Sequence, residues 1–301
     1  MKVGVTLPIG NHRGGRPAPY PAVRSFVRRA EELGLDSIWG FDHLLFRMPD
    51  AAESGVHEGW TLLAALAEAT DRVELGMLVT GLRLRNPGLV AKMAATLDHL
   101  SGGRLILGIG AGWHDPELEA FGYPVDHRVG RFEEAATVLT SLIRTGSADF
   151  DGRWVSARSA VILPPARPDI PILVGARAHR MMRLTARFAD MSNLAWFARA
   201  DDPVLLPRTA MLDDACRAEG RDPASLVRTV GISIRLPGAT EPGPGRHPLG
   251  VLPAITEDPE AALRGFAEAG FAHGIVWLEP MNETSLDRLG ATVATLRGAA
   301  S

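Results

Sequence analysis

Residues that can transfer protons or contact a flat ligand follow two apolar, strand-like stretches of the sequence. Asp42 and His43 end the stretch 37–43, and a histidine beside a carboxylate can exchange a proton near neutral pH. Gly112-Trp113-His114 follows the stretch 104–110. There, glycine lets a flat ligand approach the main chain, and the indole offers a stacking surface. Each motif also has a structural interpretation: a histidine bonded to backbone, and a glycine corner packed under a tryptophan.

A third motif, Gly175-Ala176-Arg177, joins a strand-like stretch to a helical one. The N–H groups of a helix N-terminus attract phosphate, and the arginine adds a positive charge. The alternative is an ordinary helix start with a surface arginine, which the loop by itself favours.

The run Gly108-Ile-Gly110-Ala-Gly112 invites comparison with the dinucleotide-binding fingerprint G-x-G-x-x-G. That fingerprint needs a third glycine where this chain has Trp113, and an acidic residue at the tip of the next strand. Here Glu133 and Glu134 lie inside a helical pattern instead. The context therefore argues against a Rossmann turn.

Metal and Schiff-base chemistry are also disfavoured. A metal-dependent barrel hydrolase or lyase would place His-x-His or clustered carboxylates at strand ends, where only His43 and His114 are expected. The two lysines, Lys2 and Lys92, are not placed for a Schiff base. We expect no metal site.

Short apolar stretches alternate with helical periods along the whole chain. We expect strands at 2–8, 37–43, 72–80, 104–110, 171–175, 192–196, 228–236 and 274–278. Eight strand–helix units in 301 residues predict an α/β fold of the TIM (β/α)8 barrel type, with a doubly wound open sheet as the alternative. Residues 1–301 are expected to form a single domain.

Three connections that follow the carboxyl ends of strands 1, 4 and 7 are unusually long, namely 9–21, 113–129 and 238–250. Active sites of barrels are built at that end. A fourth irregular stretch, 146–170, lies between helix 4 and strand 5 and is expected at the opposite end. The candidate site therefore consists of strand-end residues. They are Asp42, His43, Leu78, Val79, Thr80, Gly112, Trp113, Gly175, Ala176, Arg177 and Asn193.

Composition excludes several other classes. A net charge of −3 gives no drive toward nucleic acid or anionic membrane, and no apolar run reaches the length of a membrane span. The single cysteine, Cys216, excludes an intrachain disulfide framework. The N-terminus has the pattern of a first strand, not of a signal peptide, so a cytoplasmic location is expected.

Taken together, the motifs resemble the luciferase-like monooxygenase superfamily, and within it the branch that depends on the deazaflavin coenzyme F420 (F-420). The resemblance covers about residues 1–225. The motifs are DSIWGFDHL (36–44), RNPGLVAKMAATLDHLSGGRLILGIGAGWHDPELEAFG (85–122), RFEEA (131–135), PILVGA (171–176) and TARFADMSN (185–193).

The resemblance implies hydride transfer between reduced coenzyme F420 and a small organic substrate, with an FMN-dependent monooxygenase using molecular oxygen as the alternative. It places the cofactor ring in the barrel mouth, with His43 beside the reacting carbon and a non-prolyl cis peptide at Leu78–Val79 behind the ring. It assigns Gly175-Ala176 to the cofactor phosphate, with Ala176 where a second glycine is usual.

The same resemblance limits the substrate. Trp113 stands where the sugar-phosphate dehydrogenases of this branch have a catalytic glutamate, and the lysines that hold a sugar phosphate have no counterparts. Glucose 6-phosphate is therefore not expected, and His43 and Trp113 remain the candidate catalytic residues. The resemblance also implies a homodimer or higher homo-oligomer. A non-catalytic flavin-binding barrel is the alternative from another functional class.

Overall fold

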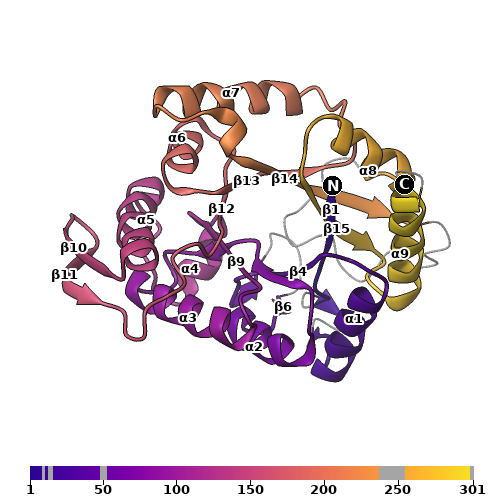
Figure 1. Ribbon diagram of the computed structural model, residues 1–301. Coiled ribbons are helices and arrows are strands. Elements are labelled where there is room, and N and C mark those ends of the chain that lie inside the picture. Colours follow the sequence, from indigo (N-terminus) through magenta and orange to yellow (C-terminus); the bar gives the residue numbers. More distant parts are fainter. Residues whose placement is uncertain (9–10, 13–15, 48–52, 237–254, 299–301) are drawn as a thin grey trace.

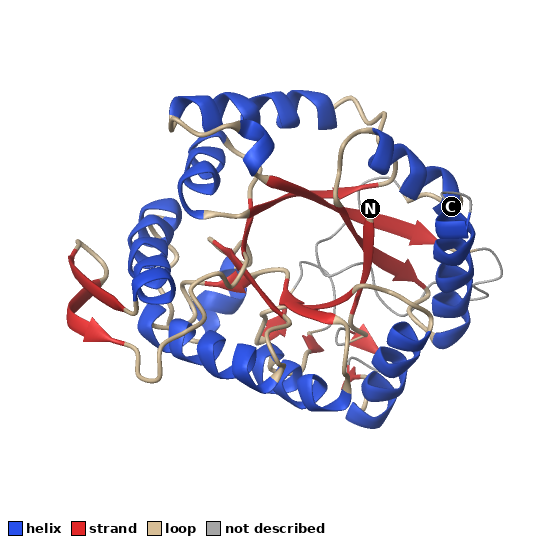
Figure 2. Cartoon of the chain, in the orientation of Figure 1, coloured by secondary structure: helices blue, strands red, loops and turns tan. Residues whose placement is uncertain are grey.

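The computed structural model describes residues 1–8, 11–12, 16–47, 53–236 and 255–298. Eight parallel strands form a closed barrel (Figures 1 and 2). In order around the barrel they are β1 (Lys2–Thr6), β4 (Ser37–Gly40), β7 (Glu74–Met77), β9 (Leu105–Gly110), β12 (Ile172–Gly175), β13 (Met191–Phe197), β14 (Val227–Arg235) and β15 (His273–Glu279). Pairing of β9 with β12 and of β15 with β1 closes the ring. The predicted barrel is confirmed, and the open-sheet alternative is wrong.

A layer of helices surrounds the barrel (Figure 2). In chain order the helices that separate the barrel strands are α1 (Tyr20–Glu32), α2 (Gly59–Ala69), α3 (Pro87–Leu100), α5 (Arg128–Thr145), α6 (His179–Phe188), α7 (Leu205–Ala218) and α8 (Pro259–Glu268), and α9 (Glu283–Gly298) follows the last strand. Asn86 caps α3 by accepting from the Gly88 N–H at 2.8 Å, and Pro87 occupies the first turn as the sequence predicts. In the described part of the chain, no helix combines the length and apolarity that crossing a bilayer requires.

The connections differ in part from the prediction. The stretch 9–21 contains the short pair β2 (Asn11–His12) and β3 (Arg16–Pro17), while 238–250 lies outside the described residues. The stretch 113–129, expected as a loop, contains the short helix α4 (Asp115–Ala120). We did not predict the long connection after β4, where β5 (Leu45–Phe46) pairs with β6 (Ser54–Gly55).

The predicted excursion at 146–170 is an antiparallel hairpin of β10 (Ser147–Asp151) and β11 (Ser156–Val161) beside α5 (Figure 1). The hairpin begins at the end of the barrel opposite the carboxyl ends of the strands, but its tip lies elsewhere. The backbone N–H groups of Arg153, Trp154 and Val155 donate to the Glu134 carboxylate at 2.7 to 2.9 Å. These bonds hold the tip of the hairpin beside the N-terminal half of α5, toward the carboxyl ends of the barrel strands. The prediction that 146–170 lies at the opposite end was therefore wrong.

The core has two parts, one between barrel and helices and one inside the barrel. The inner part contains Trp39, Ile106, Leu173, Met191, Trp196 and Ile275. Glycine makes room for the inner indoles, because a Cβ on Gly76 would overlap the Trp39 ring and one on Gly231 would overlap the Trp196 ring. The barrel is thus filled by side chains and can hold a ligand only at its mouth.

Candidate active site

The glycine run of β9 accommodates a neighbouring strand. A Cβ on Gly108 would overlap the Met77 carbonyl oxygen, and one on Gly110 would overlap Val79. The Leu78–Val79 peptide bond is cis, as the resemblance implies, and β8 (Thr80–Gly81) then pairs with the end of β9. A flat ligand was expected against Gly112, whereas Gly108 and Gly110 pack against the preceding strand and the residues that follow it. Because these two glycines have no side chains, the segment Met77–Val79 can pack against β9, and this packing places Val79 at the mouth of the barrel.

Gly112 has a different role. Its φ of +71° is a conformation that glycine adopts at little cost, and its Cα faces the Arg83 guanidinium. Arg83 in turn donates to the Ala111 carbonyl at 2.9 Å and to Asp115 at 3.3 Å. Gly112 thus forms the corner that leads from β9 to α4, and its contact with a cofactor stays a prediction.

His43 forms a buried pair with Glu117, a residue that sequence analysis missed. Nδ1 of His43 lies 2.8 Å from a carboxylate oxygen of Glu117, and the two side chains are 12% and 3% exposed. The other oxygen accepts from the Leu44 N–H and from the Leu45 N–H at 3.3 Å. Burial opposes ionisation of Glu117, but the hydrogen bond from His43 and these N–H groups outweigh it and lower the pKa of the carboxyl group.

This pair fixes which ring nitrogen of His43 can act. Because an ionised carboxylate only accepts hydrogen bonds, Nδ1 carries the hydrogen of the His43–Glu117 bond. Nε2 is then the nitrogen available for proton transfer. The resulting arrangement is that of a general acid or base oriented by a carboxylate.

Trp113 and His114 lie beside His43. The centroids of the His43 and Trp113 rings are 5.6 Å apart in an edge-to-face arrangement, and Trp113 is 38% exposed. His114 is buried, and its Nε2 accepts from the Arg47 N–H at 3.0 Å. Burial and the nearby His43 lower the pKa of His114, so the ring is a neutral acceptor. Of the two histidines, only His43 is placed for proton transfer.

Asp42 is the other member of the predicted pair, but its carboxylate is already engaged. It accepts from Nη1 of Arg85 at 2.7 and 2.8 Å and from the Gly81 N–H at 2.9 Å. Arg85 also donates to Glu58, the cap of α2, at 2.6 Å. Asp42 therefore ties the end of β4 to β8 and α2, and its direct contact with a cofactor stays a prediction.

The phosphate motif lies at the start of α6. Its N-cap residue, Ala178, has no capping side chain, which leaves the first N–H groups of the helix available. Arg177 is accessible to solvent, yet burial and the positive charge of Arg208 lower its pKa. Among the described residues, no carboxylate pairs with Arg177 or Arg208. Arg177 precedes α6, whereas Arg208 lies in the first turn of α7 and donates to the Leu194 carbonyl at 3.3 Å. A phosphate site at the N-terminus of α6 stays a prediction.

Asn193 and Thr80 differ in how well their polar atoms are satisfied. Asn193 is buried, donating to Thr229 Oγ1 at 3.1 Å and accepting from the Ala195 N–H at 3.0 Å. Oγ1 of Thr80 is buried at the strand end without a hydrogen-bond partner. A native protein satisfies nearly all such atoms, so Thr80 is the better candidate for a ligand contact. Neither assignment is tested by the geometry of the chain alone.

Three aromatic rings at the mouth were not in the predicted site. Phe41 from β4's end, Trp196 from β13 and Trp277 from β15 have ring centroids 5.6 to 6.5 Å apart. Phe41 and His43 both lie in the connection that follows β4, two residues apart, so the aromatic residue beside the predicted Asp42-His43 pair was a signal in the sequence.

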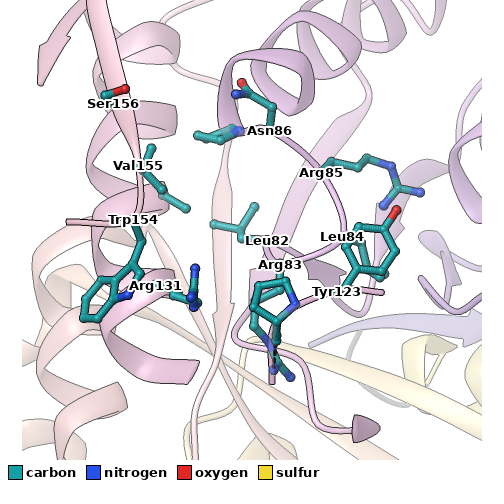
Figure 3. Close-up of a pocket in the computed structure, with 13 residues that line it drawn as sticks. Leu82, Arg83, Leu84, Arg85, Asn86, Tyr123, Arg131, Trp154, Val155 and Ser156 are labelled. Atoms are coloured by element: carbon teal, nitrogen blue, oxygen red, sulfur yellow. Dashed lines mark hydrogen bonds between the residues drawn. The ribbon is translucent and has the colours of Figure 1, made fainter. Parts of the chain in front are cut away.

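A pocket of about 410 Å³ lies between the β8–α3 connection, the α4–α5 connection and the tip of the hairpin (Figure 3). None of the predicted site residues lines it. Its arginines already have carboxylate partners: Arg83 with Asp115, Arg85 with Asp42 and Glu58, and Arg131 with Asp126. The candidate site is therefore the barrel mouth.

Comparison with solved structures supports the fold. A coenzyme F420-dependent secondary alcohol dehydrogenase bound to an F420–acetone adduct matches with a TM-score of 0.77 and 20% identity, covering 97% of both chains. A riboflavin lyase bound to modified FMN and riboflavin matches with a TM-score of 0.78 and 14% identity, covering 99% of this chain and 92% of the other.

Sequence comparison goes further than fold. Pyrimidine monooxygenase RutA of Serratia proteamaculans is 30% identical over 247 residues, covering 75% of this chain and 65% of the relative. The chain spans 63 to 66% of the length of this relative and of those from Escherichia coli K12 and Stutzerimonas stutzeri. The family model described as luciferase-like monooxygenase matches residues 1–236. The chain therefore belongs to the luciferase-like monooxygenase family, which is a family of oxidoreductases.

Proposed function

We propose that this chain is an oxidoreductase that uses coenzyme F420 to transfer hydride to or from a small organic substrate. The observation that carries the proposal is the His43–Glu117 pair at the barrel mouth, and Arg177 and Arg208, which have no carboxylate partner among the described residues, support it. When bound, reduced F420 supplies a hydride, and reduced FMN can also activate molecular oxygen. FMN is the second candidate, because a relative is named a monooxygenase and a structural neighbour contains modified FMN.

The residues at the mouth fit either cofactor. Both carry a phosphate, for which Arg177, Arg208 and the N-terminus of α6 provide charge and N–H donors. Val79 presents an apolar side chain at the mouth, and the unpartnered Thr80 hydroxyl lies beside it in the chain. The N–H of Ala176 is less useful than the resemblance implies, since it donates to the Asn193 carbonyl at 3.1 Å.

His43 is the residue that handles the proton of the reaction. Glu117 holds its Nδ1, so Nε2 can give a proton to, or take one from, a substrate oxygen as hydride is exchanged. Trp113 stands at the ring edge of His43 and limits the access of water to it. Trp113 thus affects proton transfer indirectly, by limiting the contact of His43 with water.

Cofactor binding tests this proposal directly. Purified protein is titrated into F420, FMN and riboflavin while the fluorescence of each is measured. We expect quenching of F420, and no quenching of riboflavin, which lacks the phosphate. Arg177→Ala and Arg208→Ala are each expected to weaken binding about tenfold, the usual effect of losing one charge-assisted hydrogen bond. Arg183→Ala is the matched control, because this α6 arginine pairs with Glu219.

The outcomes separate the candidates. Tight binding of FMN with oxygen consumption would favour the monooxygenase. Tight binding with no turnover on a broad substrate panel, unaffected by His43→Ala, would indicate the non-catalytic barrel. Binding of neither F420 nor FMN would contradict the proposal. The cytoplasmic location and a homo-oligomeric state remain proposals, with size-exclusion chromatography as the test of the latter.

A further inference from the structure

We infer that Phe41, Trp196 and Trp277 form a substrate subsite that selects an uncharged, planar ring compound. The inference deepens the proposed function, since it names the substrate class of the same mouth. Phe41 and Trp277 are only partly buried, and their rings are tilted at 47° with centroids 5.6 Å apart. Trp196 is nearly buried and stands edge-on to Trp277 at 84°. Tilted and edge-to-face arrangements at such spacings are the favourable geometries of aromatic pairs, and a planar substrate ring packs favourably in the same geometries.

The backbone is distorted where it presents Trp196. Ala195 has a φ of +85°, a left-handed conformation that residues with a Cβ seldom adopt. The β13–β14 register shifts between Asn193 and Trp196, which marks a bulge, and the Asn193 side chain accepts from the Ala195 N–H. Bulges and left-handed non-glycine residues gather at functional sites, where they aim a side chain. The backbone thus adopts an unfavourable local conformation that orients the Trp196 indole.

The neighbouring strand, β14, also makes room for the Trp196 side chain. Gly231 is its partner in the β13–β14 ladder, and any Cβ there would overlap the indole. The Asn193 amide that supports the bulge is held by Thr229, also from β14. Packing of the ring therefore involves two strands, as expected of a positioned binding surface.

Charges around the mouth argue against an ionic substrate. Among the described residues near the strand ends, Asp42 pairs with Arg85 and Glu279 with Arg235, while the Glu117 carboxylate is hydrogen-bonded to His43 and to two backbone N–H groups. A cationic substrate would thus have to displace one of these partners to reach Asp42, Glu117 or Glu279. An anionic substrate would compete for Arg177 and Arg208 with the phosphate of the cofactor. These charges therefore favour a neutral substrate that is bound through contacts with the aromatic rings.

The subsite lies beside the proton-transfer residue. Phe41 and His43 are separated by one residue, and Phe41 packs with Leu78 and Val79 against the inner core. A ring held against Phe41 and Trp277 would thus lie in the same mouth as His43. This arrangement links recognition to the proposed chemistry.

The test is a binding panel measured by isothermal titration calorimetry on the full chain, with and without F420 or FMN. Uracil and benzamide are the neutral planar probes, orotate and benzoate their anionic counterparts, and 2-butanone the aliphatic probe. We expect at least one neutral ring to bind about tenfold or more tightly than its carboxylate and than 2-butanone. Equal affinities across the panel, preference for an anion or for 2-butanone, or no binding of any probe would overturn the inference.

Substitutions of the subsite residues test whether the ring probes bind there. Phe41→Leu and Trp277→Leu are each expected to weaken ring binding about tenfold while changing cofactor affinity less than threefold or so. Trp154→Leu, at the tip of the hairpin, is the matched control and should change neither. Loss of cofactor affinity in the two mouth variants would assign the rings to the cofactor instead and overturn the subsite. Absence of cofactor binding by the wild-type protein would contradict the proposed function, whereas ring selectivity measured without cofactor would still stand.

Discussion

At the scale of single residues, His43 and Glu117 form one functional unit. Glu117→Gln keeps an acceptor for Nδ1 but removes the negative charge that stabilises a protonated imidazole. We expect His43→Gln to reduce kcat about a hundredfold, the lower range for loss of a general acid or base, and Glu117→Gln to reduce it less. Steady-state kinetics measure both. Glu119→Gln, an exposed change in the same short helix, is the control.

The pH dependence follows from the direction of the Glu117 shift. Because its pKa is lowered from 4.5, the carboxylate stays ionised at every pH above that value. The ratio of the wild-type kcat to that of Glu117→Gln should therefore fall toward one only below pH 4.5, as the carboxylate takes up a proton. A loss of this contribution already between pH 5 and 7 would show that another group controls the rate.

Thr80 offers a test in which stability and binding move in opposite directions. Its hydroxyl is buried and unpartnered, so Thr80→Val should leave the free energy of unfolding unchanged or raise it by about 1 kcal/mol. If the hydroxyl binds the cofactor, the same change weakens cofactor affinity. Urea unfolding and fluorescence titration measure the two effects. Thr140→Val, where the hydroxyl already donates to the Ala136 carbonyl, should bring no gain.

At the scale of elements, the contact between β9 and the segment that joins β7 to β8 depends on the absence of a methyl group at Gly110. Gly110→Ala should destabilise the protein by about 1–3 kcal/mol, since its Cβ would overlap Val79. Val79→Ala opens that space, so the double variant should be more stable than the sum of the two single changes predicts. Thermal or urea unfolding of all four proteins measures the coupling. Additive effects would mean that the two residues do not touch.

The same contact explains why a local pattern misled the sequence analysis. A glycine run at a strand end indicates that something approaches the backbone, but it does not identify what approaches. For Gly108 and Gly110 the neighbour is the chain at Met77–Val79, about 30 residues earlier in sequence. Likewise, α4 was expected as a loop because Pro116 follows Asp115, although proline is tolerated in a first helical turn.

At the scale of the whole molecule, the barrel could be predicted because each strand is apolar on both faces and each helix has its own period. The site could be predicted only as a set of strand ends. The pairs that give it chemistry join distant parts of the chain: His43 with Glu117, and Phe41 with Trp277. Such pairs depend on barrel closure and side-chain direction, which no local pattern contains.

The barrel also contains a polar group whose protonation affects the stability of the whole fold. His273 is buried inside the barrel, where Nε2 lies 2.7 Å from Ser37 Oγ. The same oxygen accepts from Trp39 Nε1 at 2.7 Å. Nδ1 has no hydrogen-bond partner. Burial and the positive charge of Lys2 lower the pKa of His273 from 6.5 to about 4.

This shift predicts acid-induced destabilisation. Above pH 6.5 the histidine is neutral in both states and contributes no pH dependence. Between pH 6.5 and about 4, the unfolded chain takes up a proton that the folded chain does not, so the free energy of unfolding falls as the pH falls. At 1.36 kcal/mol per pH unit, the loss reaches about 3 kcal/mol near pH 4. Because carboxyl groups titrate in the same range, the measurement compares urea unfolding of the wild type and His273→Gln at each pH. The variant lacks the titrating ring, so the difference in stability between the two proteins should shift in its favour on acidification, and a constant difference would show that His273 is protonated equally in both states.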